Sequence, residues 1–260
     1  MGIATIIQWF PSFLLVFIRL TTFFVTVPFF SSRNIPSIAK IGLAFFLTLI
    51  TFSAIEIKPI DFDSTFFTLI LKEVVIGLSL GLIGMIILYA IQIAGSFIDM
   101  QMGLAMASVI DPQTGVNTPI IGQFKYILAI LFLLSVNAHH ILIQGVIESY
   151  KIVPIEQLGL NLSTGKPLHV LSEAFYHMFL SAFLIAAPLV ASLFLIDVAL
   201  GIVSKTVPQL NIFVVGVPIK LFAGFLILFL VLPGYFFFLR KLFQSLFESM
   251  QALLKAMGVT

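Results

Sequence analysis

Residues 66–95 read FFTLILKEVVIGLSLGLIGMIILYAIQIAG, a run of thirty positions in which Lys72 and Glu73 are the only charged side chains. A transmembrane helix needs about 20 apolar residues, so this run is longer than one ideal crossing. We expect it to form a helix that tilts, kinks or projects beyond the hydrocarbon. Strict two-residue alternation is absent, which favours helices over the strands of a membrane barrel.

The rest of the chain has the same character. Of its 260 residues 60% are hydrophobic and 9% are charged, with 29 Phe and a mean hydropathy of +1.20. A soluble domain carries roughly a quarter of charged residues, so the solvent of this chain must be lipid, partner protein or both. Five further apolar runs complete an all-α, multi-pass membrane-type fold with about six long helices: 10–30, 38–56, 124–147, 174–200 and 212–239.

Charge and cysteine content exclude several functional classes. The formal net charge of +2 gives no reason to expect nucleic acid as a partner. Cysteine is absent, so disulfides, thiolate metal sites and thiol nucleophiles are excluded. Met1–Ser12 has no cationic region or cleavage pattern of a signal peptide, and we expect a retained first helix there.

The C-terminal residues 241–260 form an amphipathic pattern. Apolar residues recur at three- and four-residue steps from Leu242 to Met257, with polar residues between them. Such a helix could lie on the bilayer surface or pack against a partner helix.

A few charges interrupt the apolar runs. Arg19 lies midway along the first run, where it needs a partner, water or a protein interior; a structural ion pair and a residue of a solute pathway are the two interpretations. Lys72 and Glu73 are adjacent and point about 100° apart on a helix, so we expect them to serve different neighbours. Asp197 and Lys220, in or beside the last two runs, are candidates to pair with each other.

Small residues on the third run predict close helix packing. Gly77 and Gly81 form a G-x-x-x-G pattern that lets another helix approach closely. The same residues enclose Ser79 in G-x-S-x-G, which would suit an intramembrane hydrolase with His139 or His140 as base. That motif requires an exposed turn, and no oxyanion hole is recognisable nearby. For the cluster of residues 137–140, helix capping or interhelical hydrogen bonding is the favoured interpretation over a metal site.

The segment Gly95–Gln123 is unusual because polar residues alternate with methionine and small residues. A span so mixed cannot face lipid, and irregular backbone at membrane depth survives only inside protein or beside a water-filled cavity. We expect a flexible, self-packing constriction here, with an ordinary extramembrane loop as the alternative.

The order and spacing of these residues resemble the FliR family of the flagellar type III secretion export apparatus. The matching pieces are Arg19 with Pro28 and Pro36; Lys72, Glu73, Gly77 and Gly81; Ala94, Gly95, Asp99, Gln101, Met102 and Gly103; Asp111 and Pro112; Asn137 and His139; Ser149 and Pro154; and residues 208–213 (PQLNIF) with Gly216 and Pro218. Injectisome paralogues share most of this pattern.

The resemblance implies an export gate in the bacterial cytoplasmic membrane, at the flagellar basal body. FliR-like proteins assemble with FliP-like and FliQ-like subunits, an FlhB-like subunit embraces the assembly, and unfolded flagellar proteins pass through its centre. In this sequence a FliP-like portion would span 1–171, a FliQ-like hairpin 172–240 and a C-terminal helix 241–260. Family helices are bent and stacked, so six upright spans are not implied.

The resemblance also suggests roles for individual residues. A plug loop within 100–123 would place Met106, Ala107, Ser108 and Val109 just before Asp111. Charged residues would make assembly contacts or internal ion pairs, namely Arg19, Lys72, Glu73, Asp99, Asp197 and Lys220. The residues that allow close helix packing would be Gly77, Gly81, Gly95 and Gly103. We expect a non-enzymatic subunit without cofactor or metal; the alternative is a secondary transporter that binds a small solute or ion at Arg19 or Asp197.

Overall fold

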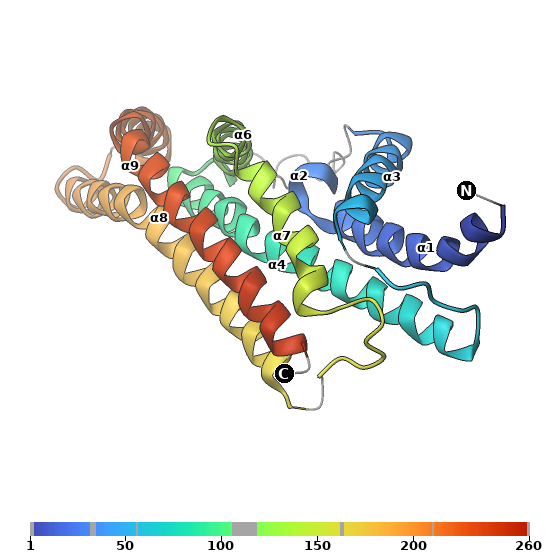
Figure 1. Ribbon diagram of the computed structural model, residues 1–260. Helices are drawn as coiled ribbons and strands as arrows, with labels where there is room; N and C mark the ends of the chain where they lie inside the picture. The colour runs from blue at the N-terminus through green and yellow to red at the C-terminus, as the bar shows by residue number, and fades with distance from the viewer. Residues whose placement is uncertain are drawn as a thin grey trace. The chain divides into compact units, whose positions relative to one another are not determined.

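The computed structural model describes residues 3–31, 35–55, 57–105, 119–161, 164–209 and 211–258. Within these ranges every regular element is a helix and none is a strand. The helices are α1 (Ile3–Thr26), α2 (Pro28–Ser31), α3 (Ser37–Ala54), α4 (Ser64–Met102), α6 (Ile120–Ser135), α7 (Ala138–Ile152), α8 (Lys166–Thr206) and α9 (Ile212–Met257), as Figure 1 shows. The predicted all-α class is confirmed, because a helix pairs its own backbone groups as an apolar solvent requires.

The prediction of a multi-pass chain is also confirmed. Five described helices are long and apolar enough to cross a bilayer, and α6 with α7 makes a sixth span if this broken pair is counted as one. The longest helices exceed the predicted runs: α4 has 39 residues, α8 has 41 and α9 has 46. At about 1.5 Å per residue, each is roughly twice as long as the ~30 Å hydrocarbon core. These helices must therefore tilt, kink or extend beyond it.

Two predicted boundaries differ from the structure. Helix α9 continues through Arg240 and Lys241, so the amphipathic C-terminal segment is the end of α9 and not a separate helix. The run 124–147 is broken between α6 and α7 at Asn137, whose backbone is left-handed (φ 55°). Asparagine adopts this conformation more readily than most residues do.

A polar cluster lies at this break. Asn137 is the N-cap residue of α7, but its side chain makes no capping hydrogen bond. The Nδ1 atom of His139 is buried without a hydrogen-bond partner among the residues described, and its ring centroid lies 4.1 Å from that of His140. Asn137 thus occupies the predicted capping position through its backbone, since its carbonyl accepts a hydrogen bond from the His140 N–H at 3.1 Å.

The chain divides into two compact units. Unit 1 comprises Met1–Ile87, Asn137–Phe175 and Gln244–Thr260, and unit 2 comprises Leu88–Val136 and Tyr176–Phe243. Helices α4, α8 and α9 contribute residues to both units.

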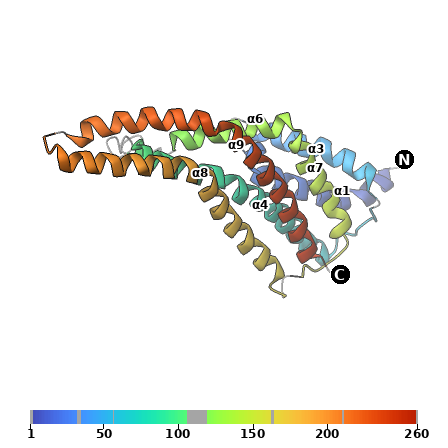
Figure 2. The same cartoon turned by 90° about the vertical axis from the view of Figure 1, so that its left-hand side faces the viewer.

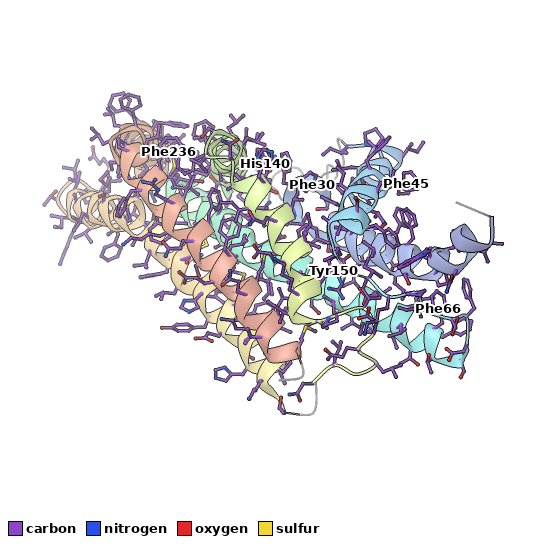
Figure 3. All side chains as sticks on the ribbon, in the orientation of Figure 1. Phe30, Phe45, Phe66, His140, Tyr150 and Phe236 are labelled. Carbon is purple, nitrogen blue, oxygen red and sulfur yellow. The ribbon has the colours of Figure 1, made fainter. Side chains whose placement is uncertain are left out.

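In unit 1, α1 packs on α3 through edge-on aromatic contacts and on α4 through glycines. The ring centroids of Trp9 and Phe52 are 5.9 Å apart, and Phe13 contacts Phe45 at 5.8 Å (Phe45 is labelled in Figure 3). On the α4 side, a Cβ atom at Gly77 would collide with Thr22 and the Arg19 carbonyl, and one at Gly81 would collide with Thr26. Both threonine hydroxyls donate back to α1 carbonyls, so they lie flat against the helix and allow close approach.

In unit 2, the parts of α8 and α9 that belong to it run antiparallel, side by side (Figures 1 and 2). The end of α4 meets α6 at its closest point where Gly95 faces the backbone of Gly122. Helix α6 contacts α9 through Phe132 and Phe236, whose ring centroids lie 5.4 Å apart. Through these contacts, α4, α6 and α9, which are apolar on most of their surface, form the packed interior of unit 2.

Candidate functional site

A buried ion pair joins α1 to α4 in unit 1. The side chains of Arg19 and Glu73 are both 0% exposed. The guanidinium binds the carboxylate with two parallel hydrogen bonds: Nε donates to Oε2, and Nη2 donates to Oε1 at 3.0 Å. This bidentate geometry is the strong form of the arginine–carboxylate interaction.

The same guanidinium is also held by α7. Its Nη1 atom donates to Ser149 Oγ at 2.9 Å and Nη2 donates to the Val153 carbonyl at 3.0 Å. It lies 4.0 Å from the ring centroid of Tyr150 (labelled in Figure 3), a cation–π distance. The Tyr150 hydroxyl in turn donates to the Val16 carbonyl of α1 at 3.1 Å. Arg19 therefore binds three helices together, and its buried, fully engaged head group is poorly placed to receive a transported solute.

Lys72 completes the charge network. Its ammonium lies 3.0 Å from Glu73 Oε1 and donates to the carbonyls of Pro154 (2.9 Å), Ile155 (2.7 Å) and Gln157 (2.9 Å). The prediction that Lys72 and Glu73 serve different neighbours is right for Arg19 and the carbonyls, but wrong in that the two also contact each other. Among the described residues, Glu73 is the acid within 4.0 Å of both buried cations, and Glu156 adds a weaker attraction to Lys72.

The charges of this network do not cancel among themselves. One carboxylate faces two cations, which leaves one net positive charge in a buried region. The excess is offset by carbonyl oxygens at and beyond the C-terminus of α7, where the helix dipole is negative. The arrangement orients α1, α4 and α7 against one another, and its stability depends on every charge keeping its partner.

A second polar cluster lies in unit 2. Lys220 Nζ on α9 is 2.9 Å from Asp197 Oδ1 on α8, and Gln101 Nε2 of α4 donates to Asp197 Oδ2 at 2.7 Å. The side chains of Lys220 and Asp197 are 18% and 38% exposed, so water screens this pair more than the network of unit 1.

Asp99 binds backbone within this chain, and its expected part in an assembly contact or internal ion pair stays a prediction. Its Oδ1 atom accepts a hydrogen bond from the backbone N–H of Ile121 at 3.1 Å, in the first turn of α6. The first N–H groups of a helix lack partners within it, and a carboxylate is favoured at that positive end. Among the described residues Asp99 therefore caps a helix rather than pairing with a cation.

Gly103 lies at the end of α4, and its expected role in helix packing stays a prediction. It follows the last residue of α4 with φ +84°, and no described atom lies within 4 Å of a Cβ built on it. Its function here is the left-handed turn that ends a helix, which favours glycine. Gly77, Gly81 and Gly95, by contrast, each face a neighbouring helix at contact distance.

The expected plug residues, Met106, Ala107, Ser108, Val109 and Asp111, lie outside the described residues. The hydrolase interpretation gains nothing from the geometry. Ser79 stands inside the continuous helix α4, whereas a nucleophile elbow requires a sharp turn. No group of three or more metal-ligating His, Cys, Asp or Glu residues occurs in the described ranges.

One interaction of unit 2 was not anticipated. Lys125 is 2% exposed, and its ammonium lies 5.0 Å from the ring centroid of Tyr235. The Tyr235 hydroxyl donates to the Lys125 carbonyl at 2.7 Å. Only the polarity of Lys125 within an apolar run signals such a contact, and nothing in the sequence indicates its aromatic partner.

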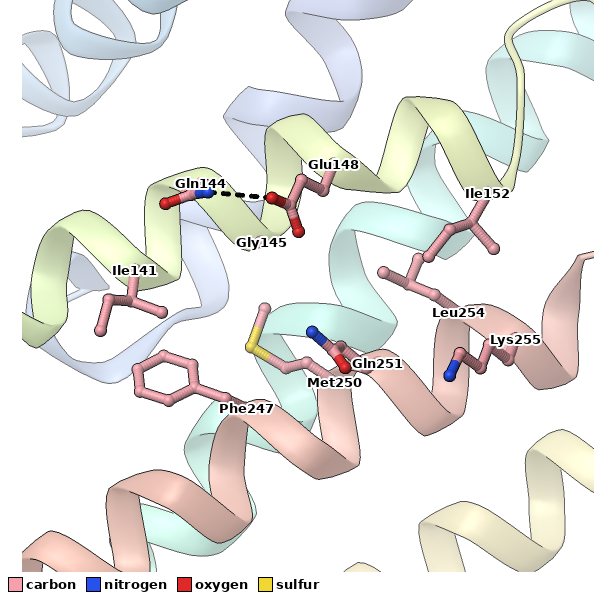
Figure 4. A pocket seen from close by; sticks show the side chains of 10 residues that line it. All are labelled: Ile141, Gln144, Gly145, Glu148, Ile152, Phe247, Met250, Gln251, Leu254 and Lys255. Atoms are coloured by element: carbon pink, nitrogen blue, oxygen red, sulfur yellow. Dashed lines mark hydrogen bonds between the residues drawn. The ribbon is translucent and has the colours of Figure 1, made fainter.

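The amphipathic end of α9 packs on α7 within unit 1. A groove of about 430 Å³ runs between them, with Met250 and Leu254 as its buried floor (Figure 4). Gln144 donates to Glu148 at 2.9 Å on the α7 wall. The bilayer surface and a partner helix were the expected locations for this apolar face, but α7 of the same chain already covers most of it.

The outer faces of α8 and α9 in unit 2 are strongly apolar and exposed. Side chains more than half exposed include Phe183, Phe194, Phe222, Phe225, Phe229, Leu230 and Phe237. Exposed apolar patches of this kind mark contacts with membrane or protein. Long apolar helices with charges buried inside each unit define a multi-pass membrane protein.

Comparison with known proteins gives the family. The model of bacterial export proteins, family 1, matches residues 10–246. The flagellar biosynthetic protein FliR of Bacillus subtilis (strain 168) is 49% identical over 257 residues, 98% of this chain and 99% of that protein. The FliR proteins of Pectobacterium carotovorum subsp. carotovorum and Escherichia coli (strain K12) are 34% and 29% identical over 244 and 243 residues, each spanning 93% of this chain and 92% of the relative. The chain belongs to the FliR family, which makes it a membrane component of the flagellar export apparatus.

Proposed function

We propose that this chain is a structural subunit of the flagellar type III export gate in the bacterial cytoplasmic membrane. It forms part of the channel through which unfolded flagellar proteins leave the cell. The observation that carries this proposal is the family match, which extends over residues 10–246. The subunit acts through shape and assembly and needs no catalytic group or cofactor.

The proposed partners are FliP-like and FliQ-like subunits, with an FlhB-like subunit around the assembly. Residues 1–171 would act as the FliP-like portion and 172–240 as the FliQ-like hairpin. The antiparallel pair α8 and α9 supports the hairpin (Figure 2). The exposed phenylalanines of these helices suit either sibling helices or lipid as neighbours.

Co-purification tests this proposal. An affinity tag on the full-length chain, expressed from its own locus, should recover FliP-like and FliQ-like chains from native membranes in one stable complex. A chain lacking 172–240 serves as the control and should lose the complex. Recovery of a monomer that binds and transports a small solute alone would instead favour a secondary transporter.

The plug hypothesis concerns residues Met106–Val109. Deleting these four residues should leave the complex intact but make the membrane permeable to ions and small solutes, because a narrow constriction would lose its filling side chains. Leakage of a small dye or of potassium from cells expressing the deleted chain is the measurement. The same deletion in cells without the FliP-like subunit should not leak, since the gate is then unassembled. Unchanged permeability in assembled gates would contradict the plug.

A further inference from the structure

The Lys72 ammonium is surrounded by more oxygen atoms than it has protons. Four oxygens lie within 3.0 Å of Nζ: Glu73 Oε1 and the carbonyls of Pro154, Ile155 and Gln157. An ammonium has three N–H donors, so at least one contact is electrostatic attraction rather than a separate hydrogen bond. The geometry is that of a cation in an oxygen cage.

The cage is formed largely by backbone carbonyls that lie outside the regular helices. The three carbonyls belong to the irregular segment that follows α7. The Pro154 carbonyl also accepts a hydrogen bond from the Gln157 N–H at 3.3 Å, whereas the Ile155 and Gln157 carbonyls accept none from backbone in the described contacts. The side chain of Lys72 is 3% exposed, which keeps water from replacing it. The contact with the Ile155 carbonyl is buried, and a buried carbonyl without a partner is costly, so this segment needs a cation at this point to hold its shape.

We propose that these four oxygens form a monovalent-cation site that the chain fills with its own Lys72 ammonium, and that a free ammonium or potassium ion occupies the site when this side chain is removed. Backbone carbonyls that converge on one point are the ligands by which potassium channels replace the water around their ion. The single carboxylate of Glu73, already shared with Arg19, suits a cation of one charge.

The site fixes the segment after α7 onto α4. Arg19 holds the carbonyl of Val153, and the cage holds the next carbonyls along the chain. Further along, Glu156 Oε1 accepts a hydrogen bond from the backbone N–H of Lys58 at 3.2 Å. Lys72 is thus a positioning residue for the connection that leads to α8.

Two substitutions separate the charge of Lys72 from its volume. Lys72→Ala leaves space and all four oxygens, whereas Lys72→Met fills the space with an uncharged chain of similar length. Lys205→Ala, which changes an exposed lysine of α8, is the matched control. The full-length chain is purified in detergent, and its thermal midpoint is followed by the fluorescence of Trp9, the one tryptophan, which lies in unit 1.

In choline chloride the midpoint of Lys72→Ala should fall by about 10 °C, because the buried Ile155 carbonyl loses its partner and Glu73 and two part-buried carbonyls lose their bond to the ammonium. At least half of this loss should be recovered in ammonium or potassium chloride of equal ionic strength. Lys72→Met should lose stability equally in all three salts, and Lys205→Ala should match the unsubstituted chain. A midpoint of Lys72→Ala that does not depend on the cation would overturn the proposal. So would failure of this variant to accumulate in the potassium-rich cell, where the site would be filled.

Discussion

Replacing Glu73 by glutamine should destabilise unit 1 more than removal of either cation beside it. Glutamine keeps the size of the side chain but removes the one carboxylate that, among the described residues, lies within 4.0 Å of both Arg19 and Lys72. Two buried cations would then face each other with no acid between them. Breaking a buried ion pair by removing one partner costs about 3–5 kcal/mol, and the repulsion between the remaining charges places this substitution at the upper end. The thermal midpoint of the purified chain and its amount in membranes measure the effect.

The expected order of stability among these variants follows from the net charge of Arg19, Lys72 and Glu73. The network carries one net positive charge in the natural chain, two in Glu73→Gln and none in Arg19→Met. Arg19→Met loses the bonds to Glu73, Ser149 and Val153 but leaves Glu73 paired with Lys72 and no cation without an acid, so its cost should lie at the lower end of the range of about 3–5 kcal/mol. The double variant Arg19→Met/Glu73→Gln returns the sum to one and should be more stable than Glu73→Gln alone. A double variant less stable than both single variants would contradict this account.

The apolar runs predicted the helices because backbone N–H and C=O groups in lipid must pair with each other, which a helix achieves within one segment. Residues 66–95 had to be a helix, and α4 contains all of them. Helix ends were less predictable. A helix can continue with polar residues where it leaves the bilayer, and with apolar residues where it enters a protein interior, so a change of polarity does not mark its end. The continuation of α9 past Arg240 is of this kind.

The identity of charged partners was predictable only where both partners carry charge. Asp197 and Lys220 lie on the last two apolar runs, so a pairing hypothesis could be written from the sequence. The principal partners of Lys72 are backbone carbonyls, and Asp99 binds a backbone N–H. Every residue offers such groups, and no residue type signals which of them will be free at the end of a helix.

The break at Asn137 illustrates a further limit. The apolar run from 124 to 147 contains too few helix-breaking residues to predict that the helix ends within it, and asparagine is tolerated in helices. The left-handed conformation of this residue is selected by packing around it, which local sequence does not encode. Likewise, the amphipathic face at the end of α9 was visible in the sequence, but its partner α7 was not.

Gly95→Ala should disrupt unit 2, because the added methyl group would collide with backbone. A Cβ atom at this position would overlap the Cα and N atoms of Gly122, so α4 and α6 would have to separate. Overpacking a tight interior costs about 1–3 kcal/mol where side chains can yield. Backbone cannot yield without moving a helix, and a loss of about 3 kcal/mol or more is expected. Separation of the helices would also lengthen the bond from Asp99 to the start of α6.

Two alanine substitutions isolate the steric effect from the change in helix propensity. Gly42 in α3 and Gly201 in α8 have no described atom within 4 Å of a built Cβ, so Gly42→Ala and Gly201→Ala should be neutral or stabilise by up to about 1 kcal/mol. Gly122→Ala should fall between, because its Cβ would meet the movable Pro119 ring at 2.8 Å. Thermal loss of helical circular dichroism in the purified variants measures the order. If Gly95→Ala were as stable as Gly42→Ala, α4 and α6 could not be in contact at Gly95. Since the contact is backbone to backbone, only a larger separation of the two helices would explain that result.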